Sequence, residues 1–267
     1  MSKLIDTYGR EHRNLRVSLT DRCSLRCTYC MPNDFAAWIP NDDLLTTNEL
    51  LTVIEVAVEQ GINEVRLTGG EPLLRPDIVE IVDRIAGLAY APRLTLTTNG
   101  LKLKELALPL AKAGLNRINI SLDTLSRERF KKLTYRDRFD DVIEGLHAAK
   151  AAGLFPIKVN TVLLQGINDD EAPALLEWAL KNEYSLRFIE QMPLDAGGIW
   201  DRATMVTADE IYADLSTHYE LTPVDGRGSA PAEEFYINGT QATVGIIGSV
   251  TRPFCGACDR LRLTSDG

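Results

Sequence analysis

Three cysteines, Cys23, Cys27 and Cys30, lie within eight residues of one another near the start of the chain. Three thiolates from one loop suit a four-iron iron–sulfur cluster, because they leave one of its irons open for a substrate or cofactor. A structural zinc site is the alternative. Zinc thiolates usually come as two Cys-x2-Cys pairs, and the spacing from Cys23 to Cys27 is one residue wider. The pattern therefore predicts a 4Fe–4S cluster with one open iron.

Two further cysteines, Cys255 and Cys258, form a Cys-x-x-Cys pair. By itself this pair is equally consistent with a zinc site, a redox pair or packing. The total of five cysteines is odd, whereas small disulfide scaffolds use even numbers in short chains. The three histidines are distant from one another in the sequence, so neither a histidine-rich metal site nor a histidine-based triad is expected. Asp123 is the nearest candidate for an acid or base, and we expect it to be structural.

The composition is that of an ordinary globular protein, with 45% hydrophobic and 25% charged residues. The net charge of −9 predicts that the surface as a whole does not bind nucleic acid or an anionic membrane, although a local basic pocket remains compatible with it. No apolar run approaches the roughly 18 to 20 residues of a membrane span, and the first residues lack the pattern of a signal peptide. We expect a soluble, cytoplasmic protein.

Strand-like and helix-like segments alternate along the chain up to about residue 190. A capping box formed by Thr46 and Glu49 opens one of the expected helices. The expected strands are 15–19, 64–68, 93–98, 117–122, 157–163 and 186–190. Six consecutive βα units indicate a parallel sheet with right-handed crossovers.

Several of these strands are apolar on one face and polar on the other, as at Arg66, Thr95, Thr97, Asn119 and Ser121. A doubly wound sheet buries both faces and reads as continuous apolar runs, and a closed eight-stranded barrel also has an apolar interior. The pattern therefore predicts an α/β fold, an open (partial) βα barrel of about six βα units whose polar face lines a cavity. Solvent-facing positions on edge strands are the alternative.

After about residue 191 the alternation gives way to a loop containing proline and glycine. A short helix near 209–215 follows, and then two strand-like pieces around an Asn238-Gly239 turn. These features predict a C-terminal extension that contains β-structure. We place the domain boundary after residue 205, with a partial barrel at 1–205 and the extension at 206–267.

The spacing Cys-x3-Cys-x2-Cys, with Tyr29 before the last cysteine, resembles the signature of radical S-adenosylmethionine (SAM) enzymes. The sequence Gly-Gly-Glu-Pro at 69–72 resembles the second motif of that family. This resemblance implies that Cys23, Cys27 and Cys30 bind a 4Fe–4S cluster, whose open iron binds the amino and carboxylate groups of SAM. Reductive cleavage of SAM then yields a 5′-deoxyadenosyl radical, so the cofactor supplies the difficult chemistry.

Motifs near both ends of the chain resemble those of one particular family of radical SAM enzymes. Segments 14–23 and 255–264 resemble those of the GTP 3′,8-cyclase family, whose members are lyases of molybdenum cofactor biosynthesis. The resemblance covers essentially the whole chain and implies conversion of GTP to the 3′,8-cyclised 7,8-dihydro-GTP. The SAM-binding residues that it implies are Tyr29, Gly70, Ser121 and Met192.

The same resemblance implies an arginine-rich GTP site. Arginine suits a triphosphate because its planar fork donates paired hydrogen bonds to phosphate oxygens. For any single arginine, a solvated surface position is the alternative. The implied GTP-binding residues are Arg16, Arg66, Thr97, Lys158, Arg187, Arg260 and Arg262.

In that family, Cys255 and Cys258 are joined by a third, downstream cysteine to bind a second 4Fe–4S cluster near the guanine base. Neither this cysteine nor the family's C-terminal di-glycine tail lies within the 267 residues, so we expect a C-terminally truncated form or part of a longer chain. Two thiolates alone should bind the second cluster poorly. The implied partners are GTP, an electron donor such as flavodoxin or ferredoxin, the next enzyme of the pathway and a second copy of the chain in a homodimer.

Two other functions remain open from the sequence. A different radical SAM enzyme with an auxiliary cluster, such as a peptide-modifying one, would share the first three cysteines but would not need the arginines as phosphate ligands. A non-enzymatic zinc-binding protein would be colourless, whereas an iron–sulfur protein is brown.

Overall fold

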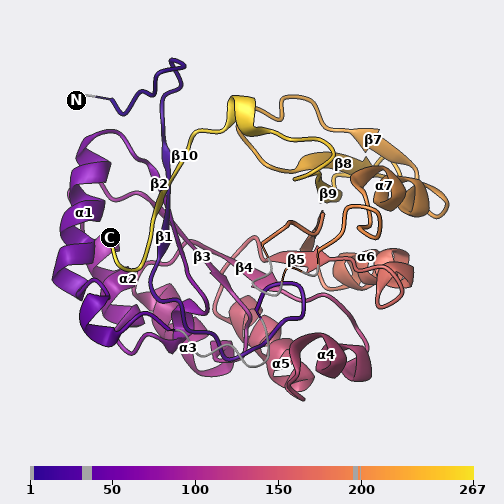
Figure 1. Ribbon diagram of the computed structural model, residues 1–267, viewed down its shortest axis with the longest axis horizontal. Coiled ribbons are helices and arrows are strands. Elements are labelled where there is room, and N and C mark those ends of the chain that lie inside the picture. Colours follow the sequence, from indigo (N-terminus) through magenta and orange to yellow (C-terminus); the bar gives the residue numbers. More distant parts are fainter. Residues whose placement is uncertain (1–2, 32–37, 195–197, 199) are drawn as a thin grey trace.

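Ten strands form one sheet in the computed structural model, which describes residues 3–31, 38–194, 198 and 200–267 (Figure 1). The strands are β1 (Asn14–Ser18), β2 (Glu64–Thr68), β3 (Arg93–Thr98), β4 (Arg117–Ser121), β5 (Lys158–Val162), β6 (Ser185–Ile189), β7 (Leu221–Pro223), β8 (Glu233–Ile237), β9 (Thr243–Ile247) and β10 (Arg260–Leu263). The α-helices are α1 (Thr47–Glu59), α2 (Ile78–Ala86), α3 (Leu103–Lys112), α4 (Arg127–Thr134), α5 (Phe139–Ala151), α6 (Ala172–Lys181) and α7 (Ala208–Ser216). Short 3-10 helices occupy Asn41–Asp43, Pro72–Leu74, Asp169–Glu171 and Cys255–Ala257.

Strands β1 to β6 are parallel neighbours in chain order, as the six βα units predict. Each expected strand is present within one residue of its predicted bounds. The capping box at Thr46 and Glu49 is confirmed, because the Thr46 side chain accepts from the Glu49 amide and the Glu49 side chain accepts from Thr46. Figure 1 shows α1 to α6 outside the curved sheet.

The two faces of the sheet differ as the alternation predicts. Val65, Leu67, Ile118 and Ile120 have no exposed surface and form part of the hydrophobic core. This burial is the main stabilising contribution, because apolar surface removed from water lowers the free energy by roughly 25 cal/mol per Å². The opposite face carries the polar residues and lines a cavity described below, so the open, partial βα barrel is confirmed.

The C-terminal extension adds strands to both sides of the six-stranded sheet. β9 pairs in parallel with β6, and β8 and β7 continue from β9 in antiparallel order. The Asn238-Gly239 turn joins β8 to β9 with both residues at positive φ, 50° and 68°. At the other side β10 pairs in parallel with β1, a pairing that the sequence reasoning did not anticipate.

This edge pairing has a physical reason. A partial barrel leaves unpaired backbone N–H and C=O groups on its two outer strands, and β9 and β10 satisfy them. The sheet is thus continuous across residue 205, and the boundary between 1–205 and 206–267 stays a prediction. No helix in the described part of the chain is long and apolar enough to cross a membrane.

Candidate active site

The loop that carries the first three cysteines follows β1 and is held by the end of α4. The backbone N–H of Thr28 donates to the carbonyl of Leu133 at 2.9 Å, and the Arg26 N–H donates to the Thr134 carbonyl at 3.1 Å. Inside the loop, the Arg26 Nη1 donates to the Cys23 carbonyl at 2.6 Å. Backbone bonds to a helix end, and not a disulfide, therefore fix the cysteine positions.

The Gly-Gly-Glu-Pro turn after β2 packs directly on this loop. The Gly70 N–H donates to the Thr20 carbonyl at 2.7 Å, and the Glu71 N–H donates to the Arg22 carbonyl at 2.7 Å. A Cβ at Gly70 would lie 2.3 Å from the carbonyl oxygens of Asp21 and Arg22. Only glycine allows the backbone to approach this closely.

The buried carboxylate of Glu71 joins the turn to the end of β3. It is 2% exposed and accepts from the Thr98 hydroxyl and the Asn99 N–H, each at 2.7 Å. Asn99 in turn directs its side-chain Nδ2 at the Cys23 sulfur, 3.8 Å away, and at the Ser24 hydroxyl, 3.1 Å away. The sequence reasoning missed Asn99. Its position directly after a predicted strand, as for Gly69 after β2, is the signal that could have found it.

The donor set fits an iron–sulfur cluster. The three thiols are free, and burial raises the pKa of each of them. Negative charge on Cys30 also contributes to the raised pKa of Cys23 and Cys27. Such thiols lose their protons when they bind metal. Within the described ranges no three His, Cys, Asp or Glu side chains could hold a single metal ion. A four-iron cluster differs in that each thiolate binds its own iron.

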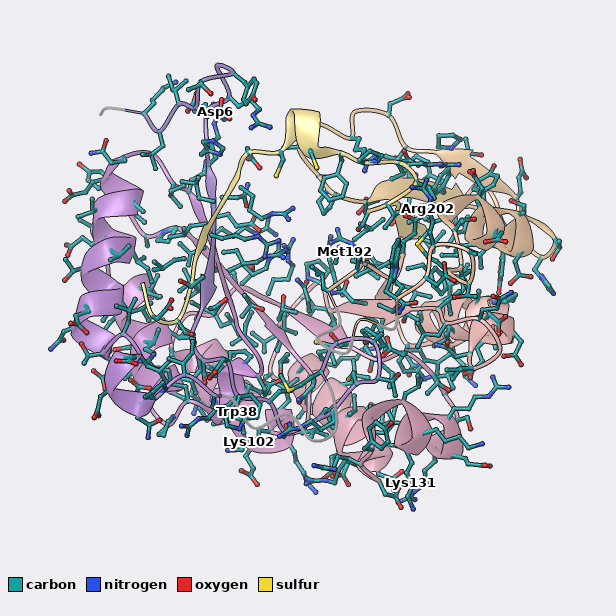
Figure 2. The ribbon with its side chains drawn as sticks, in the orientation of Figure 1. Asp6, Trp38, Lys102, Lys131, Met192 and Arg202 are labelled. Atoms are coloured by element: carbon teal, nitrogen blue, oxygen red, sulfur yellow. The ribbon has the colours of Figure 1, made fainter. Side chains whose placement is uncertain are left out.

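The residues predicted to bind SAM lie around this loop at the carboxyl ends of the strands. Ser121 is the last residue of β4, and Gly70 follows β2. The Tyr29 hydroxyl donates to the buried Asp123 carboxylate at 2.7 Å, and Asp123 also accepts from the Val162 N–H at 2.9 Å. This arrangement agrees with the structural role expected of Asp123. Met192 follows β6, is 38% exposed and lies inside the curve of the sheet in Figure 2.

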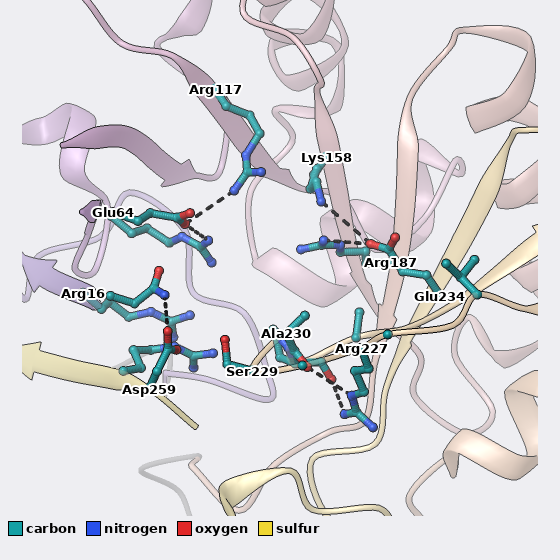
Figure 3. A pocket seen from close by; sticks show the side chains of 18 of the residues that line it. Arg16, Glu64, Arg117, Lys158, Arg187, Arg227, Ser229, Ala230, Glu234 and Asp259 are labelled. Atoms are coloured by element: carbon teal, nitrogen blue, oxygen red, sulfur yellow. Dashed lines mark hydrogen bonds and ion pairs between the residues drawn. The ribbon is translucent and has the colours of Figure 1, made fainter. Parts of the chain in front are cut away.

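A cavity of about 550 Å³ opens on the polar face of the sheet (Figure 3). Its wall includes the amino ends of β1, β2, β4 and β5, and loop 224–232 of the extension covers another side. Five of the seven residues predicted to bind GTP line it. They are Arg16, Arg66, Lys158, Arg187 and Arg260.

Two predicted GTP-binding residues are not among those that line the cavity. Arg262 on β10 pairs in register with Arg16 on β1, but the side chain of Arg262 is exposed. Thr97 lies on β3 and accepts a hydrogen bond from the Asn119 side chain at 3.2 Å. The structure therefore places Thr97 beside Asn119 on β4, outside the residues that line the cavity.

Sequence reasoning missed six charged residues of the cavity, which are Glu64, Arg117, Asp225, Arg227, Glu234 and Asp259. The sequence could have identified Arg117, because it precedes Asn119 by two residues and so lies on the same polar face of β4. Glu64 precedes Arg66 in the same way. Arg227 lies in an irregular loop, and no periodicity identifies it.

Two carboxylates of the cavity, those of Glu64 and Glu234, each lie close to two cationic side chains. Glu64 accepts from Arg66 Nη2 at 2.9 Å and lies 3.6 Å from Arg117 Nη2. Glu234 lies 3.1 Å from Arg187 Nη2 and 3.9 Å from Lys158 Nζ. Figure 3 shows both carboxylates pointing into the cavity.

Burial disfavours the charged forms of the cationic side chains in the cavity. Burial, together with the smaller effects of the nearby Arg260 and Arg66, lowers the pKa of Arg16 to about 9. Burial, together with the smaller effects of Arg187 and Arg117, likewise lowers the pKa of Lys158 to about 7. In the described part of the chain, the buried Nε atoms of Arg16, Arg117 and Arg187 have no hydrogen-bond partner. A bound polyanion would relieve both the repulsion and the missing hydrogen bonds.

The Cys-x-x-Cys pair lies at the rim of this cavity. Cys255 opens the 3-10 helix Cys255–Ala257, and Cys258 precedes the cavity-lining residues Asp259 and Arg260. Arg10 Nη1 donates to the Cys255 carbonyl at 2.6 Å. The pair is thus placed at the opposite end of the polar face from the first three cysteines.

Comparison with known proteins supports this arrangement. The Radical SAM superfamily profile matches residues 17–179, and the Molybdenum Cofactor Synthesis C profile matches residues 184–267. The chain is 59% identical over 267 residues to a GTP 3′,8-cyclase of Streptomyces coelicolor, covering 99% of this chain and 78% of that protein. It is 52% identical over 270 residues to a GTP 3′,8-cyclase of Mycolicibacterium smegmatis, covering 99% of this chain and 75% of that protein.

A solved structure of similar fold is that of Streptococcus suis SuiB bound to S-adenosylmethionine, with a TM-score of 0.61. Its identity is only 18%, and the match covers 79% of this chain and 46% of that protein, so it supports the fold alone. The much higher identities to the cyclases favour their family over a different radical SAM enzyme or a zinc-binding protein. This chain therefore belongs to the Radical SAM superfamily and, within it, to the GTP 3′,8-cyclase family.

Proposed function

We propose that the chain binds SAM at the first cysteine loop and GTP in the cationic cavity, and converts GTP to the 3′,8-cyclised 7,8-dihydro-GTP of molybdenum cofactor biosynthesis. The observation that carries this proposal is the position of the cavity. It lies on the same polar face as the cysteine loop, and its cations are partly unpartnered. Few ligands other than a polyanion would match such a wall.

The proposed GTP and SAM sites follow one another along the direction of the strands. Arg16 and Arg66 lie in the middle of β1 and β2, and Lys158 begins β5, whereas the cysteine loop and Ser121 lie at the carboxyl ends. A nucleotide whose phosphates contact the arginines would extend along the strands toward the cofactor. When bound, the cluster supplies the electron that cleaves SAM and starts the radical reaction.

The protein's own contribution is positioning. The arginines hold the phosphates, and the sheet holds the ribose against the cofactor, so that one C–H bond is presented in a fixed geometry. Loop 224–232 covers the cavity and excludes water that would otherwise compete for the cations.

The proposal includes a second 4Fe–4S cluster bound in part by Cys255 and Cys258. Its support is the position of this pair in the sequence, because Cys258 directly precedes the cavity-lining residues Asp259 and Arg260. A cluster there would face the base of a nucleotide whose phosphates lie on the arginines. The proposal also includes an external one-electron donor such as flavodoxin or ferredoxin, because the electron for SAM cleavage must come from outside the chain. A homodimer and transfer of product to the next enzyme are further parts of it.

Equilibrium binding of GTP tests the assignment of the cavity. A hydrogen bond to a charged group contributes about 1.5 to 3 kcal/mol, so Arg260→Ala should weaken GTP binding by roughly 10- to 150-fold. SAM affinity should change little, since Arg260 lies outside the cysteine loop. Equal weakening of both ligands would indicate a collapsed fold. Unchanged GTP affinity would remove Arg260 from the site, and absence of GTP binding to the unmodified chain would overturn the function itself.

A further inference from the structure

We propose that Arg117 determines the specificity of the cavity for a nucleoside triphosphate by binding its terminal phosphate. This inference rests on the proposed function, because it takes the cavity to be the nucleotide site. Arg117 is the first residue of β4, lines the cavity and is 8% exposed. Figure 3 shows its side chain pointing from β4 toward Glu64.

The hydrogen bonds of Arg117 are incomplete. Its buried Nε atom has no partner in the part of the chain that the structure describes, and its ion pair with Glu64 is 3.6 Å long. That distance is too long for a hydrogen bond. Buried polar groups in native proteins are almost always satisfied, so a guanidinium that faces a cavity with an unsatisfied Nε indicates a site for an anionic ligand.

Glu64, the counterion of Arg117, has a second cationic partner. Glu64 has a shorter ion pair with Arg66 Nη2, at 2.9 Å. If a phosphate takes Arg117, the Glu64 carboxylate therefore keeps a partner and is not left as a buried unpaired charge. The exchange costs little on the protein side and gives Arg117 a charge-assisted, bidentate contact.

The electrostatic surroundings favour the same exchange. Burial is the largest of the effects that lower the pKa of Arg117 to about 10. Glu64 opposes this decrease, and the cations Arg93, Arg66 and Arg187 contribute to it. The cavity holds seven cationic side chains, and four acidic ones partly neutralise them. Arg117 lies on β4, which stands in the sheet between β1 and β2 on one side and β5 and β6 on the other. It is thus placed between the two cation groups that a phosphate chain would contact.

The register of the sheet indicates which phosphate Arg117 would bind. Lys158 pairs with Asn119, and Arg187 pairs with Asn160, which itself pairs with Ser121. Arg117 therefore lies two residues deeper than Lys158 and four deeper than Arg187, measured from the carboxyl ends of the strands. Two residues of strand span about 6.6 Å. Across the other neighbouring strands, Arg66 and Arg16 lie level with Arg117, and Arg260 lies two residues deeper. Since the ribose must reach the cofactor at the carboxyl ends, the far end of the phosphate chain lies at the level of Arg117, beyond Lys158 and Arg187.

The experiment compares the binding of GTP, GDP and GMP to the same chain by calorimetry, in the unmodified protein and in Arg117→Ala and Arg117→Lys. We expect Arg117→Ala to weaken GTP binding at least tenfold and to weaken GDP and GMP binding less than threefold. The ratio of GDP to GTP dissociation constants should therefore collapse toward one. Arg117→Lys should fall between the two, because lysine keeps the charge without the bidentate fork.

Arg93→Ala is the matched control. Arg93 is exposed, lies outside the cavity wall and influences Arg117 only through its charge. This variant should leave all three affinities within twofold. If Arg117→Ala is not folded by circular dichroism, Arg117→Lys carries the test, and its GDP-to-GTP ratio should still fall at least threefold.

The outcomes separate this inference from the proposed function. Equal weakening of GTP, GDP and GMP, or unchanged binding of all three, would overturn the assignment of Arg117 to the terminal phosphate while leaving the GTP site intact. Failure of the unmodified chain to bind any of the three nucleotides would overturn the proposed function itself.

Discussion

Arg10 and Cys255 are joined by a hydrogen bond of 2.6 Å from Arg10 Nη1 to the Cys255 carbonyl, across 245 positions of sequence. Arg10 is itself held by the Asp6 carboxylate, with its Nε donating at 2.7 Å. The N-terminal segment thereby fixes the 3-10 helix Cys255–Ala257 at the rim of the cavity. The position of the second cysteine pair depends on a contact with the first residues of the chain.

We predict that Arg10→Ala loosens this segment. The Cys258 N–H, which donates to the Cys255 carbonyl at 3.3 Å, should exchange with deuterium several-fold faster, because its helix loses its anchor. Hydrogen exchange followed by mass spectrometry of a peptide covering residues 253–259 measures this. Arg13→Ala is the control, since the Arg13 side chain forms an ion pair with Glu11 and none with the second cysteine pair among the described residues. Equal exchange rates in the two variants would contradict the anchoring role.

We predict that Cys27→Ala abolishes SAM cleavage without unfolding the chain. Three thiolates are needed to leave one iron open, and two do not hold the cluster in this form. Iron content and 5′-deoxyadenosine formation after anaerobic reconstitution with dithionite provide the measurement. Cys258→Ala should retain measurable cleavage, because Cys258 lies at the other end of the polar face. Full cleavage by Cys27→Ala would show that this loop does not bind the cluster.

The pKa of Lys158 predicts a pH dependence of GTP binding. Burial and the neighbouring Arg187 lower this pKa from 10.5 to about 7, whereas a bound polyphosphate favours the charged amine. GTP affinity should therefore fall as the pH rises above 7, by up to about tenfold per unit for one proton. Lys158→Arg should bind GTP with a shallower slope, because arginine stays charged. Identical slopes for the two proteins between pH 7 and 9 would rule out Lys158 as the titrating group.

The same shift has a consequence for folding. Between pH 7 and 10.5 the unfolded chain binds more protons at Lys158 than the folded chain does. The contribution of Lys158 to the free energy of unfolding therefore rises with pH in this window and is lost as the pH falls to 7. Denaturant titrations of the unmodified chain and of Lys158→Met at pH 7 and pH 9 measure this difference. The unmodified chain should gain more stability over this interval.

We predict that Gly70→Ala disrupts the cofactor site. Its Cβ would lie 2.3 Å from two backbone carbonyl oxygens, those of Asp21 and Arg22, so the segment before Cys23 must shift. Iron content after reconstitution should fall by at least half. Gly87→Ala is the matched control, because the nearest atom to its Cβ would be 3.4 Å away at the end of α2. Normal iron loading of Gly70→Ala would show that the loop adapts.

The sequence by itself determined the local features of this protein. The spacing of Cys23, Cys27 and Cys30 and the glycine turn at 69–72 predicted the cofactor loop, which the structure assembles after β1 and β2. Alternation along β2 and β4 predicted a sheet with one apolar and one polar face. These features were readable because side-chain period, capping and ligand spacing act over a few residues.

Only the tertiary structure decided which strands close the edges and which charges meet. The pairing of β10 with β1 brings Arg260 to the cavity wall beside Arg16, and the extension brings Glu234 to Arg187. The ion pair of Arg117 on β4 with Glu64 on β2 likewise forms only in the tertiary structure. Contacts of this kind join residues far apart in sequence, and they follow from edge pairing and the curvature of the sheet. No local period records them, because the energy that selects them is gained only when the whole sheet has formed.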